Sequence, residues 1–122
     1  MIINPLMQGK GGGGSRVSKF QIAIIEVGEY TRFSIPISSG QDTIEIKLIK
    51  AGSGSIIAPS IWYFNENGGM YKSVIEEWTY GLEKTTISAL MQKHGVTELP
   101  AYLLFLERGY VGRVLEFTYT RK

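Results

Sequence analysis

The fold is decided by the C-terminal stretch Ala101-Tyr-Leu-Leu-Phe-Leu-Glu-Arg-Gly-Tyr-Val-Gly-Arg-Val-Leu-Glu-Phe-Thr-Tyr-Thr120. Two segments of β-type composition flank a glycine-containing loop at residues 109–112. The first segment is apolar on both faces, which is typical of a strand covered on both sides. In the second, Leu115, Phe117 and Tyr119 alternate with polar residues, as in a strand with one buried face. The stretch therefore predicts the central hairpin of a β core.

Upstream of this stretch, further strand-like segments recur at intervals of roughly ten residues. Residues 20–25 are apolar on both faces, whereas residues 31–37 place Thr31, Phe33 and Ile35 on one side. Pro36 cannot donate to a β ladder, so we expect the second of these strands at a sheet edge or a bulge. Residues 44–48 alternate between apolar and charged side chains, which predicts a half-buried antiparallel strand.

The tract Asn65-Glu-Asn-Gly-Gly69 is a strong hairpin signal after the aromatic segment at residues 60–65, because Asn-Gly supplies the positive φ angles of tight turns. Its partner lies within residues 70–83, which we interpret as a strand from their β-branched and aromatic content; their apolar spacing also fits a helix. Thr85 or Thr86 is expected to cap a short helix that ends at His94-Gly95.

Together these signals predict an all-β fold, an antiparallel β-sandwich or jelly roll of about eight strands with one short helix. The 122 residues fit a single folded domain, which we place at residues 17–122. Residues 1–16 differ in kind and form a predicted Gly-rich N-terminal arm.

Charge and composition argue against several function classes. The formal charge is +2, and the 13 basic residues are interleaved with 11 acidic ones, so we expect no nucleic-acid partner. No apolar run approaches the ~20 residues of a membrane span, and we expect no membrane partner. Cysteine is absent and there is one histidine, so neither a metal site nor any other cofactor is predicted.

No catalytic residue is predicted either. The glycines after Lys10 lack the Lys-Ser/Thr and the helix of a phosphate-binding loop, and His94 is expected to cap a helix end or face solvent. Glu76 and Glu77 are adjacent and cannot act as a cooperating pair in a strand. An enzymatic alternative would bring at least two of Glu45, Glu107 and Glu116 into one cleft.

The aromatic residues around the predicted hairpin are Trp62, Tyr63, Phe64, Tyr71, Trp78 and Tyr80. Most are expected in the core. Because exposed Trp and Tyr side chains stack on sugar rings or anchor interfaces, we select Tyr63, Trp78 and Tyr110 as candidates for surface recognition.

The N-terminus Met1-Ile-Ile-Asn-Pro-Leu-Met-Gln-Gly-Lys, followed by a glycine run, resembles the small accessory virion proteins of tailed bacteriophages, such as capsid decoration, head-fibre or tail components. The resemblance implies a virion location, an arm that docks on other virion proteins and on copies of the chain itself, and a β-domain exposed outside the particle. An engineered GGGGS linker is an alternative explanation of the glycines, but the preceding residues do not look like a tag. The apolar side chains and the proline of the arm form the predicted interface: Ile2, Ile3, Pro5, Leu6 and Met7.

The sequence thus predicts a non-enzymatic structural or assembly protein of a bacteriophage virion. The alternative is a carbohydrate-binding jelly-roll module that uses exposed Trp and Tyr to bind a host-surface glycan. Trp78-Thr-Tyr80, residues 102–106 and Gly112-Arg-Val-Leu-Glu-Phe117 resemble the later strands of galactose-binding-type jelly rolls.

Overall fold

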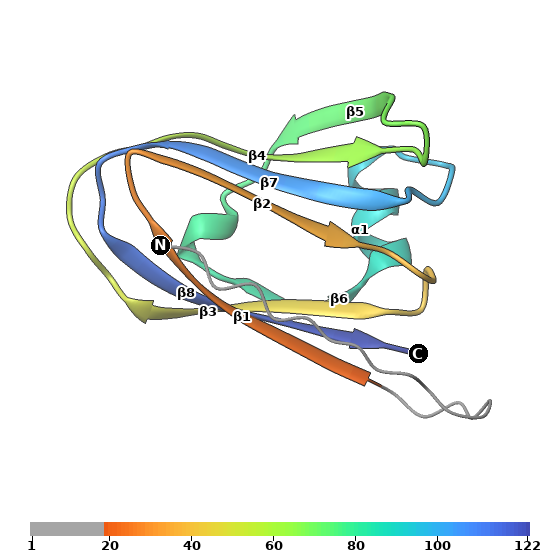
Figure 1. Ribbon diagram of the computed structural model, residues 1–122, viewed down its shortest axis with the longest axis horizontal. Coiled ribbons are helices and arrows are strands. Elements are labelled where there is room, and N and C mark those ends of the chain that lie inside the picture. Colours follow the sequence, from red (N-terminus) through yellow and green to blue (C-terminus); the bar gives the residue numbers. More distant parts are fainter. Residues whose placement is uncertain (1–18) are drawn as a thin grey trace.

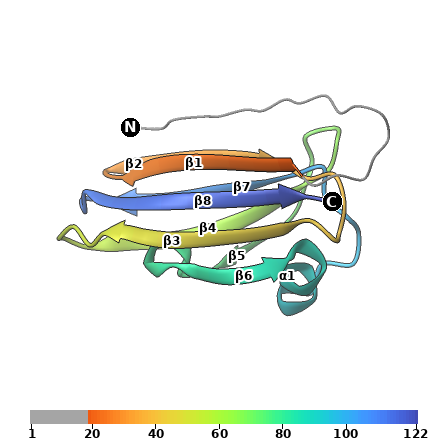
Figure 2. The same ribbon diagram turned by 90° about the horizontal axis from the view of Figure 1, so that it is seen from below.

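The computed structural model describes residues 19–122, in which two four-stranded antiparallel sheets pack face to face and a helix covers one end of the sandwich (Figure 1). Sheet A consists, in spatial order, of β1 (Lys19–Val27), β8 (Arg113–Arg121), β3 (Thr43–Lys50) and β6 (Leu82–Thr86). Sheet B consists of β2 (Tyr30–Pro36), β7 (Tyr102–Gly109), β4 (Ile56–Phe64) and β5 (Met70–Ile75). Figure 2 shows the strands of sheet A side by side in this order.

The strands pair as they would in one long hairpin, the first strand with the last and so on toward the middle of the chain. β1 pairs with β8, β2 with β7, β3 with β6 and β4 with β5, all antiparallel. Rolling this ribbon into a sandwich adds the pairs β3–β8 and β4–β7. The arrangement is a jelly roll, which confirms the predicted all-β sandwich of about eight strands with one short helix.

The predicted hairpin at residues 101–120 is wrong, although both of its strands are central. β7 lies between β2 and β4 in sheet B, and β8 lies between β1 and β3 in sheet A. Residues 110–112 therefore cross from one sheet to the other, as does the β3–β4 link, at the left in Figure 1. Three residues can span roughly 10 Å, which is the usual distance between packed sheets. A loop of this length therefore does not by itself distinguish a hairpin from a crossing.

The position of each strand in its sheet explains its burial. β1 is an edge strand with one buried face, so Ile22 and Ile24 are 43% and 37% exposed and the prediction that both faces are buried is wrong. β2 is an edge strand as Pro36 predicts, with Thr31, Phe33 and Ile35 facing the core.

The core lies between the sheets and is centred on four aromatic rings in tilted or edge-to-face contact. Trp78 packs against Phe105 and Phe117 with ring centroids 5.5 and 5.8 Å apart. Phe117 also contacts Phe105 and Phe33 at 5.1 and 5.0 Å. These geometries are favourable for aromatic pairs, and they hold the two sheets together at the middle of the sandwich.

The ambiguous segment 70–83 contains a strand, as predicted, but a short one. β5 ends at Ile75, and residues 78–80 form the 3-10 turn η1 (Trp78–Tyr80), which inserts Trp78 into the core. Helix α1 (Ile87–His94) begins as predicted, with the Thr86 hydroxyl accepting a hydrogen bond from the Ala89 N–H. It ends at His94, and the following residue Gly95 caps it with a left-handed φ of 74°.

Candidate functional site

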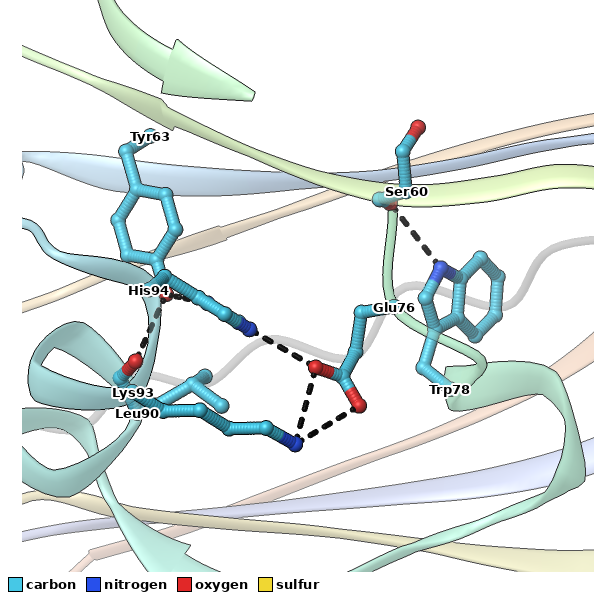
Figure 3. A network of polar contacts seen from close by, with 7 residues as sticks. All are labelled: Ser60, Tyr63, Glu76, Trp78, Leu90, Lys93 and His94. Carbon is cyan, nitrogen blue, oxygen red and sulfur yellow. Dashed lines mark hydrogen bonds and ion pairs between the residues drawn. The ribbon is translucent and has the colours of Figure 1, made fainter. Parts of the chain in front are cut away.

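A network of polar side chains joins the end of helix α1 to both β4 and the segment after β5 (Figure 3). His94 Nε2 lies 2.8 Å from Glu76 Oε1, and His94 Nδ1 lies 2.5 Å from the Tyr63 hydroxyl. Lys93 Nζ is 3.2 Å from Glu76 Oε1 and completes the cluster at its exposed edge. Tyr63 also reaches the Leu90 carbonyl at 3.4 Å. His94 is 8% exposed and Tyr63 is fully buried.

The electrostatics of this network favour an ionised Glu76. Burial by itself raises the pKa of Glu76, but the hydrogen bonds from His94 and Lys93 outweigh it and hold the pKa below its usual value. For Tyr63, burial and the nearby Glu76 charge raise the pKa, so the phenol stays protonated. A histidine between a carboxylate and a hydroxyl can relay a proton, but here the hydroxyl is enclosed in the core, and the arrangement fastens helix α1 to sheet B.

Another carboxylate, that of Asp42, is buried and organises the link between β2 and β3. Its Oδ2 accepts hydrogen bonds from the Ser38 N–H, the Ser38 hydroxyl, the Ser39 N–H and the Tyr119 hydroxyl, and its Oδ1 accepts one from the Lys122 N–H. Burial raises the pKa of Asp42, but these donors outweigh it and the pKa is lowered overall. Asp42 therefore ties a loop to the C-terminal end of the chain.

The other buried carboxylate, that of Glu107, is unpaired. It is fully buried on the inner face of β7, and neither oxygen has a hydrogen-bond partner among the described residues. Burial raises the pKa of Glu107 to about 7, although the nearby Thr31 hydroxyl lowers it somewhat without regular hydrogen-bond geometry to either oxygen. Arg113 Nε and Thr79 Oγ1 are also buried without a partner in the described part of the chain. The interior thus holds several polar atoms whose hydrogen bonds are unmet.

The outer face of sheet B differs from an ordinary solvated β surface. Strand register places the following side chains on it, by strand: Tyr30, Arg32, Ser34 and Pro36 on β2; Tyr102, Leu104, Leu106 and Arg108 on β7; Ile57, Ser60, Trp62 and Phe64 on β4; Met70, Ser73 and Ile75 on β5. None of these positions carries a carboxylate, and most are apolar. Antiparallel sheets usually present polar residues on the face that does not contact the core.

Three aromatic rings form a stack on this face. Trp62 and Phe64 are 6.3 Å apart at an interplanar angle of 13°, and Phe64 and Tyr102 are 4.9 Å apart at 4°. The Trp62 indole donates a hydrogen bond from Nε1 to Ser60 Oγ at 3.0 Å, which fixes its orientation. The row of near-parallel rings ends at Trp62.

A groove of about 270 Å³ lies beside Trp62, and Ser60, Leu106, Ile75 and Arg108 also line it. One wall is Ala58, whose φ of 49° is left-handed and lies in the shift of register between Ile57 and Ser60. A side chain with a Cβ in this region costs about 1–2 kcal/mol. Such strained positions and bulges cluster at functional sites.

Of the three residues predicted to act in surface recognition, two are buried and one is exposed. Tyr63 and Trp78 are each 0% exposed, so their selection as surface residues is wrong: Tyr63 points inward toward His94, and η1 carries Trp78 into the core. Tyr110 is 71% exposed, and its hydroxyl donates to Glu29 at 2.9 Å. The predicted arm residues Ile2, Ile3, Pro5, Leu6 and Met7 lie outside the described residues.

The carboxylates of the enzymatic alternative are not in one cleft. Glu45 and Glu116 lie on the outer face of sheet A, whereas Glu107 points into the core. His94 does end helix α1, but it is buried and doubly hydrogen-bonded, so the expectation of a simple cap or an exposed side chain is wrong. Within residues 19–122, no group of three or more His, Cys, Asp or Glu side chains is placed to hold a metal ion. No helix in this range is long and apolar enough to cross a membrane.

The sequence reasoning missed Trp62 and Arg108, which the structure places at the same groove. Alternation alone puts Trp62 on the opposite face from Tyr63, and that signal is present in the sequence. Which of the two faces is the outer one, and which strand brings Arg108 beside Trp62, depends on the pairing of β4 with β7.

The chain was compared with protein-family models, with curated proteins and with solved structures, and none of the three comparisons found a match.

Proposed function

We propose that this chain is a non-enzymatic structural protein of a bacteriophage particle, attached through residues 1–16 and displaying the jelly-roll domain for recognition. The observation that carries the proposal is the difference between the two outer faces of the sandwich. Sheet B presents a mainly apolar face with two arginines and no carboxylate. Apolar patches rimmed by polar groups mark interaction sites.

The outer face of sheet A supports this division by contrast. There Glu116 lies between Ile24 and Lys47, and Thr118 lies between Ile22 and Glu45. This face mixes charges of both signs with hydroxyl groups, as expected of a solvated surface. A displayed domain needs only one recognition face, and sheet B has the chemistry for it.

The attachment is assigned to the arm because its sequence offers apolar side chains at one end of a glycine-rich spacer. Ile2, Ile3, Leu6 and Met7 could each contribute about 1.5–3 kcal/mol if buried on a partner. The spacer at residues 8–18 adds eleven residues before β1, a reach of up to about 40 Å. The partners of this arm are other virion proteins and copies of the chain itself.

The test compares the full chain with a variant that lacks residues 1–15, each produced together with the particle. Thermal unfolding monitored by circular dichroism should be unchanged, because the described core begins after the deletion. The full chain should be found in purified particles by mass spectrometry, and the truncated chain should be absent. Incorporation of both in equal copy number, or of neither, would contradict the proposal.

The carbohydrate-binding alternative is a second candidate, and the groove at Trp62 is the observation that favours it. In this candidate the sugar would contact Trp62, because Tyr63 and Trp78 are buried. Both candidates are compatible, because a displayed domain can bind a glycan on sheet B while the arm holds it on the particle.

A further inference from the structure

We infer that the groove at Trp62 binds an acidic sugar, namely a pyranose ring that carries a carboxylate. The inference rests on the proposed function only in that sheet B is the recognition face. Its geometry comes from Trp62, Ser60 and Arg108, which line one groove of about 270 Å³.

The indole of Trp62 provides the aromatic surface on which the sugar ring would stack. Its orientation is fixed by the hydrogen bond to Ser60 Oγ, and the ring of Phe64 lies nearly parallel to it. The groove opens beside the same indole, so a ligand ring in it would contact an aromatic surface that is already ordered. Tryptophan combines a large apolar surface with one polar atom, which suits the C–H face of a sugar.

The polar groups of the groove suit a ligand with hydroxyl groups and a negative charge. Ser60 Oγ accepts from Trp62 and can still donate its own proton. Arg108 is exposed and forms no ion pair with any described residue. A guanidinium binds a carboxylate through two parallel hydrogen bonds. With no carboxylate on this face, an acidic ligand meets no repulsion there.

The size of the groove sets the length of the ligand that it holds. Pockets for drug-sized molecules enclose roughly 300–1,000 Å³, so this groove takes one sugar ring of a longer glycan. The rest of the glycan would extend over the apolar face of sheet B. Ala58 forms one wall, at the bulge where β4 has one residue more than β7 between Ile57 and Ser60.

The experiment titrates the purified full chain with matched acidic and neutral oligosaccharides: sialyllactose against lactose, and trigalacturonic acid against maltotriose. Binding is followed by tryptophan fluorescence, since the chain has two tryptophans and Trp78 is enclosed in the core. At least one acidic probe should bind with at least tenfold higher affinity than its neutral counterpart. A Trp62→Phe variant should lose the fluorescence response.

Two arginine variants make the test specific. Arg108→Gln should weaken binding of the acidic probe by about tenfold or more and remove the preference over the neutral probe. Arg32→Gln is the matched control: it removes the same charge from the same face but does not line the groove, and it should retain the preference. Equal thermal unfolding of both variants will show that neither change acts through the fold.

The inference is overturned if neither acidic probe binds at millimolar concentration, or if neutral probes bind equally well. It is also overturned if a blocked peptide with one glutamate between two leucines binds the groove more tightly than either glycan, since the face would then be a protein-docking site. These outcomes are measured on the isolated chain. Incorporation into particles through the arm can therefore succeed or fail independently.

Discussion

The imidazole of His94 lies between the Glu76 carboxylate and the Tyr63 hydroxyl, 2.8 Å from the first and 2.5 Å from the second. The three residues come from the end of α1, the segment after β5, and β4. Because both ring nitrogens are engaged, helix α1 is held against sheet B by side chains as well as by apolar packing. Loss of Glu76 or of Tyr63 leaves a ring nitrogen of the buried His94 unpaired, which costs more than the bond itself contributes.

Replacing Glu76 with glutamine should reduce stability by about 1–3 kcal/mol at pH 7, because the buried His94 loses its charged partner. The folded-state pKa of Glu76 is lowered, so its contribution is present above 4.5, the ordinary glutamate value, and is lost as the pH falls through the folded pKa. Wild type should therefore lose stability below pH 4.5 more steeply than Glu76→Gln in urea unfolding. The neighbouring Glu77→Gln, at an exposed position, should behave as wild type. Identical acid profiles for all three proteins would contradict the role of Glu76.

Glu107 predicts the opposite dependence on pH. Its folded-state pKa is raised to about 7 from 4.5, so the fold favours the protonated form. Its stabilising contribution is complete below pH 4.5 and is lost as the pH rises through about 7. Glu107→Gln should match wild type at pH 4 and exceed its unfolding free energy at pH 8 by about 1–3 kcal/mol.

The control for this measurement is Glu116→Gln, which makes the same chemical change on the outer face of sheet A, away from the core. The difference in unfolding free energy between Glu116→Gln and wild type should be the same at pH 4 and at pH 8. If the Glu107→Gln and wild-type curves run parallel over this range, the buried carboxylate is not the titrating group.

Local signals predicted the elements of this fold well, because their causes are local. Thr86 caps α1 through its own hydroxyl, and Gly95 ends the helix with a left-handed backbone that favours glycine. The assignment of strands to sheets could not be predicted in this way. A short glycine-containing loop at residues 109–112 fits a hairpin and a crossing between sheets equally, and only pairing over long sequence separations decides between them.

The candidate site was harder to predict for the same reason. Alternation separates Trp62 from Tyr63, but it does not say which of them faces the core. That choice is made by partners distant in sequence: His94 meets the Tyr63 hydroxyl inside, while Leu104 pairs beside Trp62 outside. Trp78 was misplaced because the chain leaves the strand after Ile75 and turns inward through η1.

Asp42 should be the most sensitive polar residue in the β2–β3 link. Asp42→Ala removes the acceptor for five hydrogen bonds, including the one that the buried Tyr119 hydroxyl donates. We expect a loss of about 3 kcal/mol or more in the free energy of unfolding, measured with urea. The adjacent Gln41→Ala, at an exposed position, should cost less than about 0.5 kcal/mol. A small and equal effect of both changes would show that the backbone alone maintains the loop.

The left end of the sandwich in Figure 1, where the β3–β4 and β7–β8 links cross between the sheets, depends on glycine for a steric reason. Ser53 N–H donates to the Val111 carbonyl at 2.8 Å, which brings the two links into contact. Gly54 has a φ of +95°, and a Cβ built there would overlap the Tyr110 carbonyl oxygen. Gly68, in the β4–β5 turn, has a similar φ of +85° but no atom within 4 Å of such a Cβ.

Alanine at Gly68 should therefore cost only the backbone strain of about 1–2 kcal/mol. At Gly54 the same strain adds to a clash with backbone that cannot move without separating the two links, and we expect about 3 kcal/mol or more. Urea unfolding of Gly54→Ala and Gly68→Ala measures the difference, and equal losses would mean that φ alone, and not the contact between the links, requires glycine at residue 54.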